Sequence, residues 1–139
     1  MKRRITTIAL TATFSALIGG ALLNAQDRSE VANVPFAFHA NGKLMPAGTY
    51  SIAEQNAAGD VYQITSSAGS LFWLGTQEKK ADPANPKLTF VKAGDEYVLS
   101  SISMPGSTVS RGISDAAVQK GFSRSMGIVS LVSIPLHAR

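Results

Sequence analysis

Few side chains of this protein could do chemistry near neutral pH. Its 139 residues include two histidines, His39 and His137, and no cysteine. A metal site built on the histidines would need both rings close together with a carboxylate beside them, and nothing in their spacing favours this. The lack of cysteine excludes thiol catalysis, disulfides and cysteine-ligated metals. The sequence therefore predicts no metal site and no cofactor.

Serine-based catalysis is the enzymatic alternative that stays open. No serine lies in a G-x-S-x-G motif, and none is followed three residues later by a lysine. A serine, a histidine and an acid can nevertheless assemble from distant positions in a chain. The alternative is a small secreted hydrolase that uses His39 with a serine, and it requires a serine hydroxyl beside His39. No catalytic residue is assigned from a motif.

A short apolar segment offers the first candidate binding residue. A strand through it would place Phe72 and Leu74 on one face, and Leu71 and Trp73 on the other. One of these faces must belong to the core. If the face with Trp73 is exposed, its indole could stack on a sugar ring or on an apolar partner surface. The competing interpretation is a strand that is buried on both sides.

Positive charge is concentrated near the C-terminus. From residue 104 onward a single acid, Asp115, accompanies four basic residues, Arg111, Lys120, Arg124 and Arg139. Arg111, Lys120 and Arg124 are therefore candidates for binding an anionic polymer of the cell envelope, and the alternative is an ordinary solvated surface. Aromatic residues are not interleaved with these charges, so the sequence predicts no nucleic-acid partner.

The elements that position these residues follow a segment typical of export signals. Three basic residues follow Met1, and residues 5–23 form an uncharged run rich in Ala, Leu, Ile and Thr. A positive start, an apolar run and small residues near a cut site predict a cleavable signal peptide over residues 1–25. An uncleaved anchor is disfavoured because Gly19-Gly20 and several threonines interrupt the run. We expect an exported chain, periplasmic or extracellular, without a stable membrane span after cleavage.

Residues 26–139 are predicted to form a single, mostly β domain. The formal net charge of the whole chain is +4, but three of its 13 basic residues belong to the signal segment. The remaining ten stand against nine acids, so the exported chain is close to neutral. A chain of about 110 residues can bury a hydrophobic core without covalent cross-links.

Alternating apolar residues predict about seven short strands. They fall near residues 34–38, 50–52, 61–65, 71–74, 88–91, 97–102 and 128–134. Such strands are too short to span a membrane as β-strands, which need about 9–11 residues. Their regular spacing indicates an all-β fold, a small antiparallel sandwich or barrel.

Turn and cap residues complete the expected organisation. Asn41-Gly42 predicts a tight turn, and Ser114 is placed to cap one short helix near 114–124. Residues 27–33 and 75–86 are expected to be irregular. Pro35 cannot donate a ladder hydrogen bond, so the first strand is expected either to lie at a sheet edge or to start near this residue. An exposed edge there could pair with another chain.

Two stretches resemble a group of short exported bacterial proteins of unknown function. These proteins share a V-P-F-x-F strand and an L-P-A-G-x-Y turn, matched here by residues 34–38 and 44–50. Met45 stands between Leu44 and Pro46, a small departure from that turn. With residues 88–90 and 94–99, the resemblance covers about residues 33–103. It implies an exported β domain and carries over no catalytic residue.

These observations predict a non-enzymatic exported or cell-envelope module with a binding or structural role. Its expected partner is an envelope polymer or a protein, and its candidate binding residues are Trp73, Arg111, Lys120 and Arg124. The secreted hydrolase built on His39 is the alternative.

Overall fold

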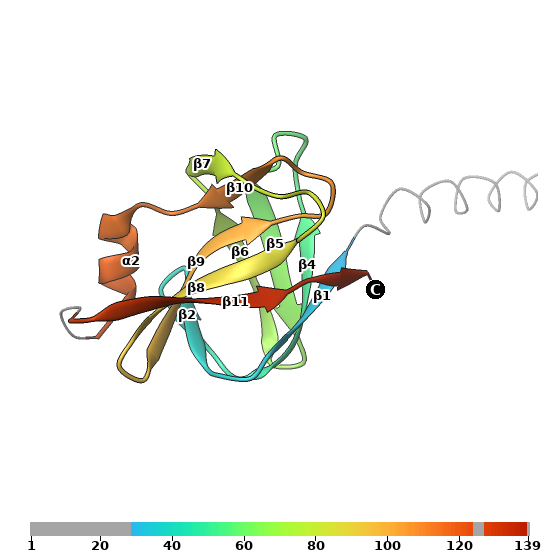
Figure 1. Cartoon of the computed structure of the whole chain (residues 1–139). Helices are drawn as coiled ribbons and strands as arrows, with labels where there is room; N and C mark the ends of the chain where they lie inside the picture. The colour runs from blue at the N-terminus through green and yellow to red at the C-terminus, as the bar shows by residue number, and fades with distance from the viewer. Residues whose placement is uncertain (1–28, 124–126, 139) are drawn as a thin grey trace, which may run out of the picture.

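Strands dominate the structure, a computed structural model that describes residues 29–123 and 127–138. These residues form twelve strands and one short helix (Figure 1). The mostly β fold with one short helix that the sequence predicts is confirmed. The predicted signal peptide, residues 1–25, and two of the basic residues, Arg124 and Arg139, lie outside the described residues. None of the described helical residues belongs to a segment long and apolar enough to cross a membrane.

The smaller sheet has five antiparallel strands. Their spatial order is β12 (His137–Ala138), β1 (Glu30–Val34), β4 (Gly48–Glu54), β5 (Val61–Ser66) and β6 (Gly69–Leu74). The neighbours β4, β5 and β6 follow one another in the chain and are joined by short turns. The C-terminal strand β12 closes the other side of β1.

The larger sheet has seven strands. Five lie in the order β11 (Val129–Pro135), β8 (Lys87–Ala93), β9 (Glu96–Ser103), β10 (Val109–Gly112) and β7 (Gln77–Lys80). The hairpin of β2 (Phe38–Ala40) and β3 (Lys43–Met45) joins them through a short parallel contact between β2 and β9.

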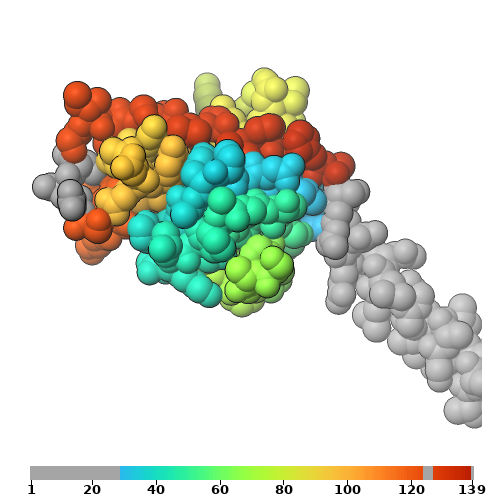
Figure 2. Space-filling view, turned by 90° about the horizontal axis from the view of Figure 1, so that it is seen from below, coloured from blue at the N-terminus to red at the C-terminus, as the bar shows by residue number. Residues whose placement is uncertain are grey.

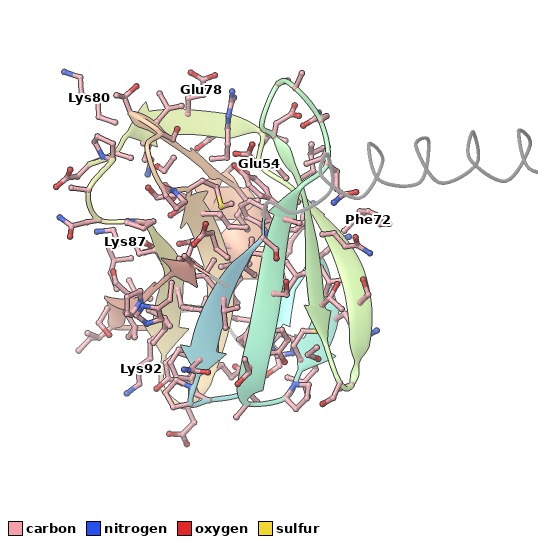
Figure 3. The ribbon with its side chains drawn as sticks, turned by 90° about the vertical axis from the view of Figure 1, so that its right-hand side faces the viewer. Glu54, Phe72, Glu78, Lys80, Lys87 and Lys92 are labelled. Carbon is pink, nitrogen blue, oxygen red and sulfur yellow. The ribbon has the colours of Figure 1, made fainter. Side chains whose placement is uncertain are left out.

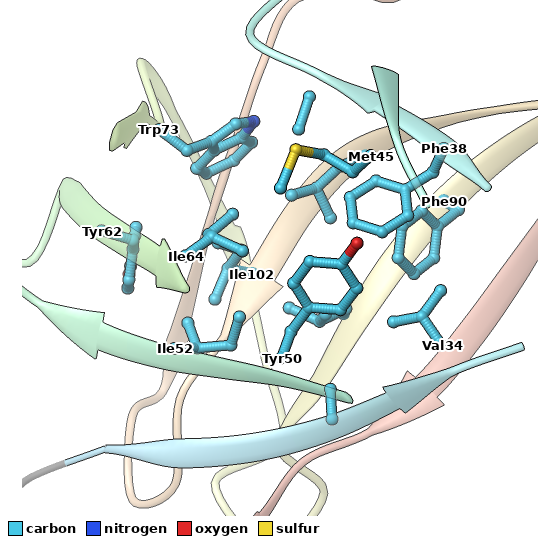
Figure 4. Close-up of a cluster of buried hydrophobic side chains, with 14 of the residues drawn as sticks. Val34, Phe38, Met45, Tyr50, Ile52, Tyr62, Ile64, Trp73, Phe90 and Ile102 are labelled. Atoms are coloured by element: carbon cyan, nitrogen blue, oxygen red, sulfur yellow. The ribbon is translucent and has the colours of Figure 1, made fainter. Parts of the chain in front are cut away.

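Side chains of both sheets meet in one core between them (Figure 4). Tyr50 and Ile52 of β4, Ile64 of β5 and Phe90 of β8 are each at most 1% exposed. Phe38 of β2 packs edge-on against the rings of Tyr50 and Phe90, with ring centroids 5.2 and 5.1 Å apart. Burying each such side chain contributes about 1.5–3 kcal/mol. The sandwich alternative of the predicted fold is therefore the one that the protein adopts.

The helix α2 (Asp115–Gly121) covers part of the outer face of the larger sheet (Figure 1). Ser114 caps it, as predicted, by accepting a hydrogen bond from the backbone N–H three residues later at 3.2 Å. Successive residues of β9 point to opposite faces, so Leu99 enters the main core while Val98 faces the helix. Val118 and Phe122 bury Val98 in a second, smaller core.

The first predicted strand, residues 34–38, is in fact two strands in different sheets. β1 ends at Val34 in the smaller sheet, and β2 begins at Phe38 in the larger one. Pro35 cannot extend the ladder, because it has no backbone N–H. Residues 30–33, expected to be irregular, belong to β1. The expected open edge is also wrong, since β1 pairs with β4 on one side and with β12 on the other.

The stretch 75–86, expected to be irregular, contains strand β7. All four residues of β7 are exposed, so it lacks the apolar alternation that reveals a strand in sequence. It forms only because β10 pairs with it. Among the other strands beyond the predicted seven, β2, β3 and β12 have two or three residues, too few for a periodic pattern, and β10 has four.

The C-terminal segment connects the two sheets. β11 pairs with β8 at one edge of the larger sheet, and β12 pairs with β1 at one edge of the smaller sheet. Between them, the N–H of Leu136 donates to the carbonyl oxygen of Pro86 at 3.0 Å. Figure 2 shows this red segment at the surface beside the blue N-terminal strand. The predicted strand at 128–134 is confirmed, with bounds shifted by one residue.

Candidate functional site

A cleft of about 350 Å³ lies where α2, the β2–β3 hairpin and the end of β6 meet. Most of its wall is apolar, from Trp73, Leu74, Val98, Leu99 and Ile113. Three polar side chains, His39, Asn41 and Lys120, also line it. An apolar cleft with a few polar groups is the usual form of a small-ligand site.

The hairpin of β2 and β3 positions His39. This residue lies at the centre of β2, opposite Leu44 of β3 and opposite Val98 of β9. Asn41 and Gly42 have φ angles of 50° and 74°, the left-handed geometry that the predicted turn requires. The Nδ2 group of Asn41 donates to the carbonyl oxygen of Phe72 at 3.0 Å, which ties the hairpin to β6.

The imidazole of His39 has an unsatisfied nitrogen. Its Nδ1 atom is buried and has no hydrogen-bond partner among the described residues. A buried polar atom without a partner costs about 1–3 kcal/mol, because it loses its hydrogen bonds to water. A neutral imidazole can either donate or accept at this nitrogen, depending on its tautomer. The ring lines the cleft, but Nδ1 itself is closed to solvent, so the unsatisfied nitrogen is a cost within the fold and not a contact point for a ligand in the cleft.

The helix α2 contributes the positive charge of the cleft. Lys120, in its last turn, lines the cleft and is exposed, and within residues 29–123 and 127–138 it forms no ion pair. Gly121 follows it and lets the helix approach β9 closely, because an added Cβ would lie 2.9 Å from two carbons of Val98. Lys120, one of the predicted binding residues, is thus held at the rim of an apolar cavity.

Trp73, another predicted binding residue, is buried rather than exposed. Its side chain is 2% exposed, and its ring packs against Tyr62 with centroids 6.1 Å apart. The outer face of β6 instead presents Phe72, which is 56% exposed (Figure 3), and Leu74 is 51% exposed. The interpretation of Trp73 as a surface stacking platform is therefore wrong. The smaller sheet packs its Trp73 face against the core, and Trp73 also contributes to the wall of the cleft.

Arg111, a third predicted binding residue, does not line the cleft. Its Nη1 atom lies 2.6 Å from a carboxylate oxygen of Glu78 in β7, and its Nη2 donates to the carbonyl oxygen of Ala58 at 2.9 Å. Ala58 belongs to the β4–β5 turn of the smaller sheet. The guanidinium therefore joins the two sheets through one ion pair and one hydrogen bond. The fourth, Arg124, lies outside the described residues.

The hydrolase alternative lacks its neighbours in the cleft. His39 lines the cleft, but none of the described lining residues is a serine, an aspartate or a glutamate. His137 is exposed in β12 and does not line it. Among the residues that the structure describes, no three His, Cys, Asp or Glu side chains cluster in a way that could hold a metal. Among the described lining residues, His39 is therefore accompanied by no serine and no carboxylate.

Sequence reasoning missed the other cleft residues, Asn41, Val98 and Ile113. Asn41 was visible as a turn residue, yet its hydrogen bond to β6 depends on a contact 31 positions away. No protein-family model, curated protein or solved structure matches the chain. The resemblance to short exported proteins of unknown function therefore stays a prediction.

Proposed function

We propose that this protein is a non-enzymatic, exported binding module of the cell envelope whose ligand enters the cleft beside α2. The observation that carries the proposal is the combination of an apolar wall with the polar side chains of His39, Asn41 and Lys120 in one cleft. Together these groups favour a ligand with an apolar body and an acidic group.

The chemistry of the wall supports an acidic ligand. A carboxylate near Lys120 would gain a charge-assisted hydrogen bond, while His39 and Asn41 supply further polar contacts. None of the described lining residues carries a carboxylate, so a negative ligand meets no like charge from them. An acidic envelope polymer would place one such group in the cleft and leave the rest of its length outside.

Co-sedimentation tests the proposal. The purified chain is spun with isolated envelopes and with purified acidic cell-wall polymer over a series of salt concentrations. We expect binding that weakens as salt rises, because Lys120 is exposed and its attraction is screened. Failure to bind at every salt concentration would contradict the proposal.

Two variants locate the binding site. Lys120→Gln should weaken binding about fivefold at low salt, the effect of roughly 1 kcal/mol from one exposed charge. Lys80→Gln removes the same charge from β7, which is exposed and does not line the cleft. Equal losses in both variants would show that binding follows net charge rather than the cleft. His39→Gln should weaken binding at high salt as well, because its contribution is a hydrogen bond.

The export part of the proposal has its own test. We expect the mature chain in the periplasm or the medium, with a new N-terminus after Ala25. N-terminal sequencing of the protein from fractionated cells gives this directly. An intact N-terminus on protein recovered from the cytoplasm would overturn the envelope assignment, whatever the cleft binds.

A further inference from the structure

The described sheets leave one long edge without protection. Natural edge strands avoid pairing with other chains through charge, short length or a covering group. β7 carries Glu78, Lys79 and Lys80, and in β6 the carbonyl of Phe72 already accepts from Asn41. β3 and β12 have three and two residues. β11 has seven residues, no charge, and only β8 as a hydrogen-bonded neighbour among the residues that the structure describes.

The direction of the free backbone groups in β11 follows from two residues at its end. The N–H of Leu136 donates toward the β8 side, to Pro86, and alternate residues of an antiparallel strand point the same way. The backbone N–H and C=O groups of the odd-numbered residues of β11 therefore point away from β8. Pro135, which has no N–H, occupies one of them and breaks no bond to β8. Val129 and Leu131 thus present at the edge N–H and C=O groups that no described strand pairs with.

The same two residues expose apolar side chains. Val129 is 45% exposed and Leu131 is 72% exposed, and the preceding Ile128 is 97% exposed. Val129 lies opposite Ala93 of β8, and Leu131 lies opposite Val91. Both side chains are on the face of the larger sheet that α2 covers farther along. The edge thus combines unpaired backbone with an uncovered apolar strip.

We propose that β11 pairs in antiparallel fashion with β11 of a second copy of this chain, about a two-fold axis at Ser130. Val129 then faces Leu131 of the second copy, and Leu131 faces its Val129. Each of these two pairs exchanges two backbone hydrogen bonds, because both residues point their polar groups outward. The side chains of Val129 and Leu131 from the two copies then cover one another on the same face of the joined sheet. Ser130, at the axis, is small enough for the close approach of a non-hydrogen-bonded pair.

Charge and space favour a second copy as the occupant. A two-fold axis makes the strand meet itself, and a strand without charges meets no like charge. Continuing the β1–β12 register would bring Val34, the last residue of β1, opposite Ile134. The half of β11 from Val129 to Val132 thus extends past the end of β1 and can receive another strand. The larger sheets of the two copies would become one continuous sheet.

The interface is small, so the dimer should be weak and depend on concentration. A few ladder bonds and four apolar side chains bury less than a standard interface of about 1,600 Å². Sedimentation velocity on the purified full chain, from about 1 to 100 µM, covers the range expected for such an interface. We expect a shift from monomer to dimer across it. A wild-type chain that stays monomeric at the highest concentration would overturn the proposal.

A matched pair of variants locates the interface. Leu131→Lys places a charge in the paired strip and should raise the dimer dissociation constant at least about 100-fold, since the charge would be buried without a partner. Leu44→Lys makes the same change at another exposed leucine, 61% exposed on β3, and should leave the dimer unchanged. Equal effects of the two variants would overturn the assignment to β11. Circular dichroism checks that both remain folded.

Mixing charged variants tests the register. Val129→Lys and Leu131→Glu should each be monomeric alone. Mixed together they should recover dimers, because the two new charges of opposite sign directly face each other across the axis at Ser130. No recovery would overturn this register, and a purified chain that instead carries a different protein in stoichiometric amount would overturn the choice of a second copy.

Discussion

A Cβ atom added to Gly121 would lie 2.9 Å from both γ-carbons of Val98. Real Cβ atoms do not approach other carbons so closely, so α2 can rest on β9 at its present distance only with glycine at this position. Val98 is the centre of the smaller core beneath the helix, and both residues also line the cleft. The contact therefore sets the height of the helix over the sheet and the width of the cleft.

Gly121→Ala should destabilise the protein despite the higher helix propensity of alanine. Overpacking against a stiff β-branched side chain costs about 1–3 kcal/mol, against a gain of up to ~1 kcal/mol from propensity. Urea unfolding measures the difference. Gly48→Ala is a suitable control, because nothing lies within 4 Å of an added Cβ there. If the cost persisted undiminished in a Val98→Ala background, this contact would not be its cause.

Arg111→Gln should lower stability by about 1–2 kcal/mol, because it removes a charged donor from the carbonyl of Ala58 and the ion pair with Glu78. Glu78→Gln should cost less than about 1 kcal/mol, since that side chain is 55% exposed. Thermal unfolding of both variants measures the two effects. Co-sedimentation with envelope polymer should be nearly unchanged in Arg111→Gln, and a large loss there would place ligand contacts outside the cleft.

Stability should fall as the pH rises above 10. Burial, with a smaller effect of the charge on Glu54, raises the pKa of Tyr62 from 10.0 to about 12, and burial also raises the pKa of Tyr50. Below pH 10 both folded and unfolded chains hold these protons, so the stability is fully present. Above pH 10 the unfolded chain ionises first, and each tyrosine removes at most ~1.4 kcal/mol per pH unit until its folded-state pKa is reached.

The Tyr62→Phe variant separates the loss of stability caused by ionisation of Tyr62 from losses of stability that other groups cause at high pH. Urea unfolding between pH 8 and pH 12 should show a shallower decline than in the wild type. At neutral pH the variant should lose about 1 kcal/mol, because the Tyr62 hydroxyl donates to the carbonyl of Gly59 at 2.7 Å. An unchanged slope above pH 10 would mean that Tyr62 ionises alike in the folded and unfolded chains.

Trp73, the only tryptophan, should report on both burial and ligand binding. We expect its fluorescence to be blue-shifted and poorly quenched by iodide in the folded protein, because the side chain is 2% exposed. An acidic envelope ligand in the cleft should change this emission, since Trp73 lines the cavity. Strong iodide quenching of the folded protein would contradict the burial. The Lys120→Gln variant should need more ligand for the same spectral change.

Local signals in the sequence predicted a good part of the fold. The helix began where Ser114 could cap it, and the turn formed at Asn41-Gly42, because both depend on neighbours a few residues away. Six of the seven strands predicted from apolar alternation overlap observed strands, whereas the first, residues 34–38, is divided between β1 and β2. β7 could not be found in this way, because its four exposed residues form a strand only through pairing with β10.

The candidate site was less accessible to sequence reasoning. The segment 71–74 showed two possible faces, and no local signal tells which face meets the other sheet. The structure places Trp73 inside and Phe72 outside. Arg111 and Lys120 looked alike as basic residues, yet Arg111 is held by Glu78 and Ala58, while Lys120 lines the cleft.

By itself, the sequence of this protein determined what depends on short spans of chain: the β character, the capped helix, the tight turns and the lack of cysteine chemistry. Tertiary structure alone decided what depends on distant partners. It brought His39 and Lys120 to one cleft, buried Trp73, and paired β1 on both sides, while β11 has only β8 as a neighbour among the described strands. The physical reason is that burial and strand pairing are set by residues far apart in the chain, whose meeting no local pattern encodes.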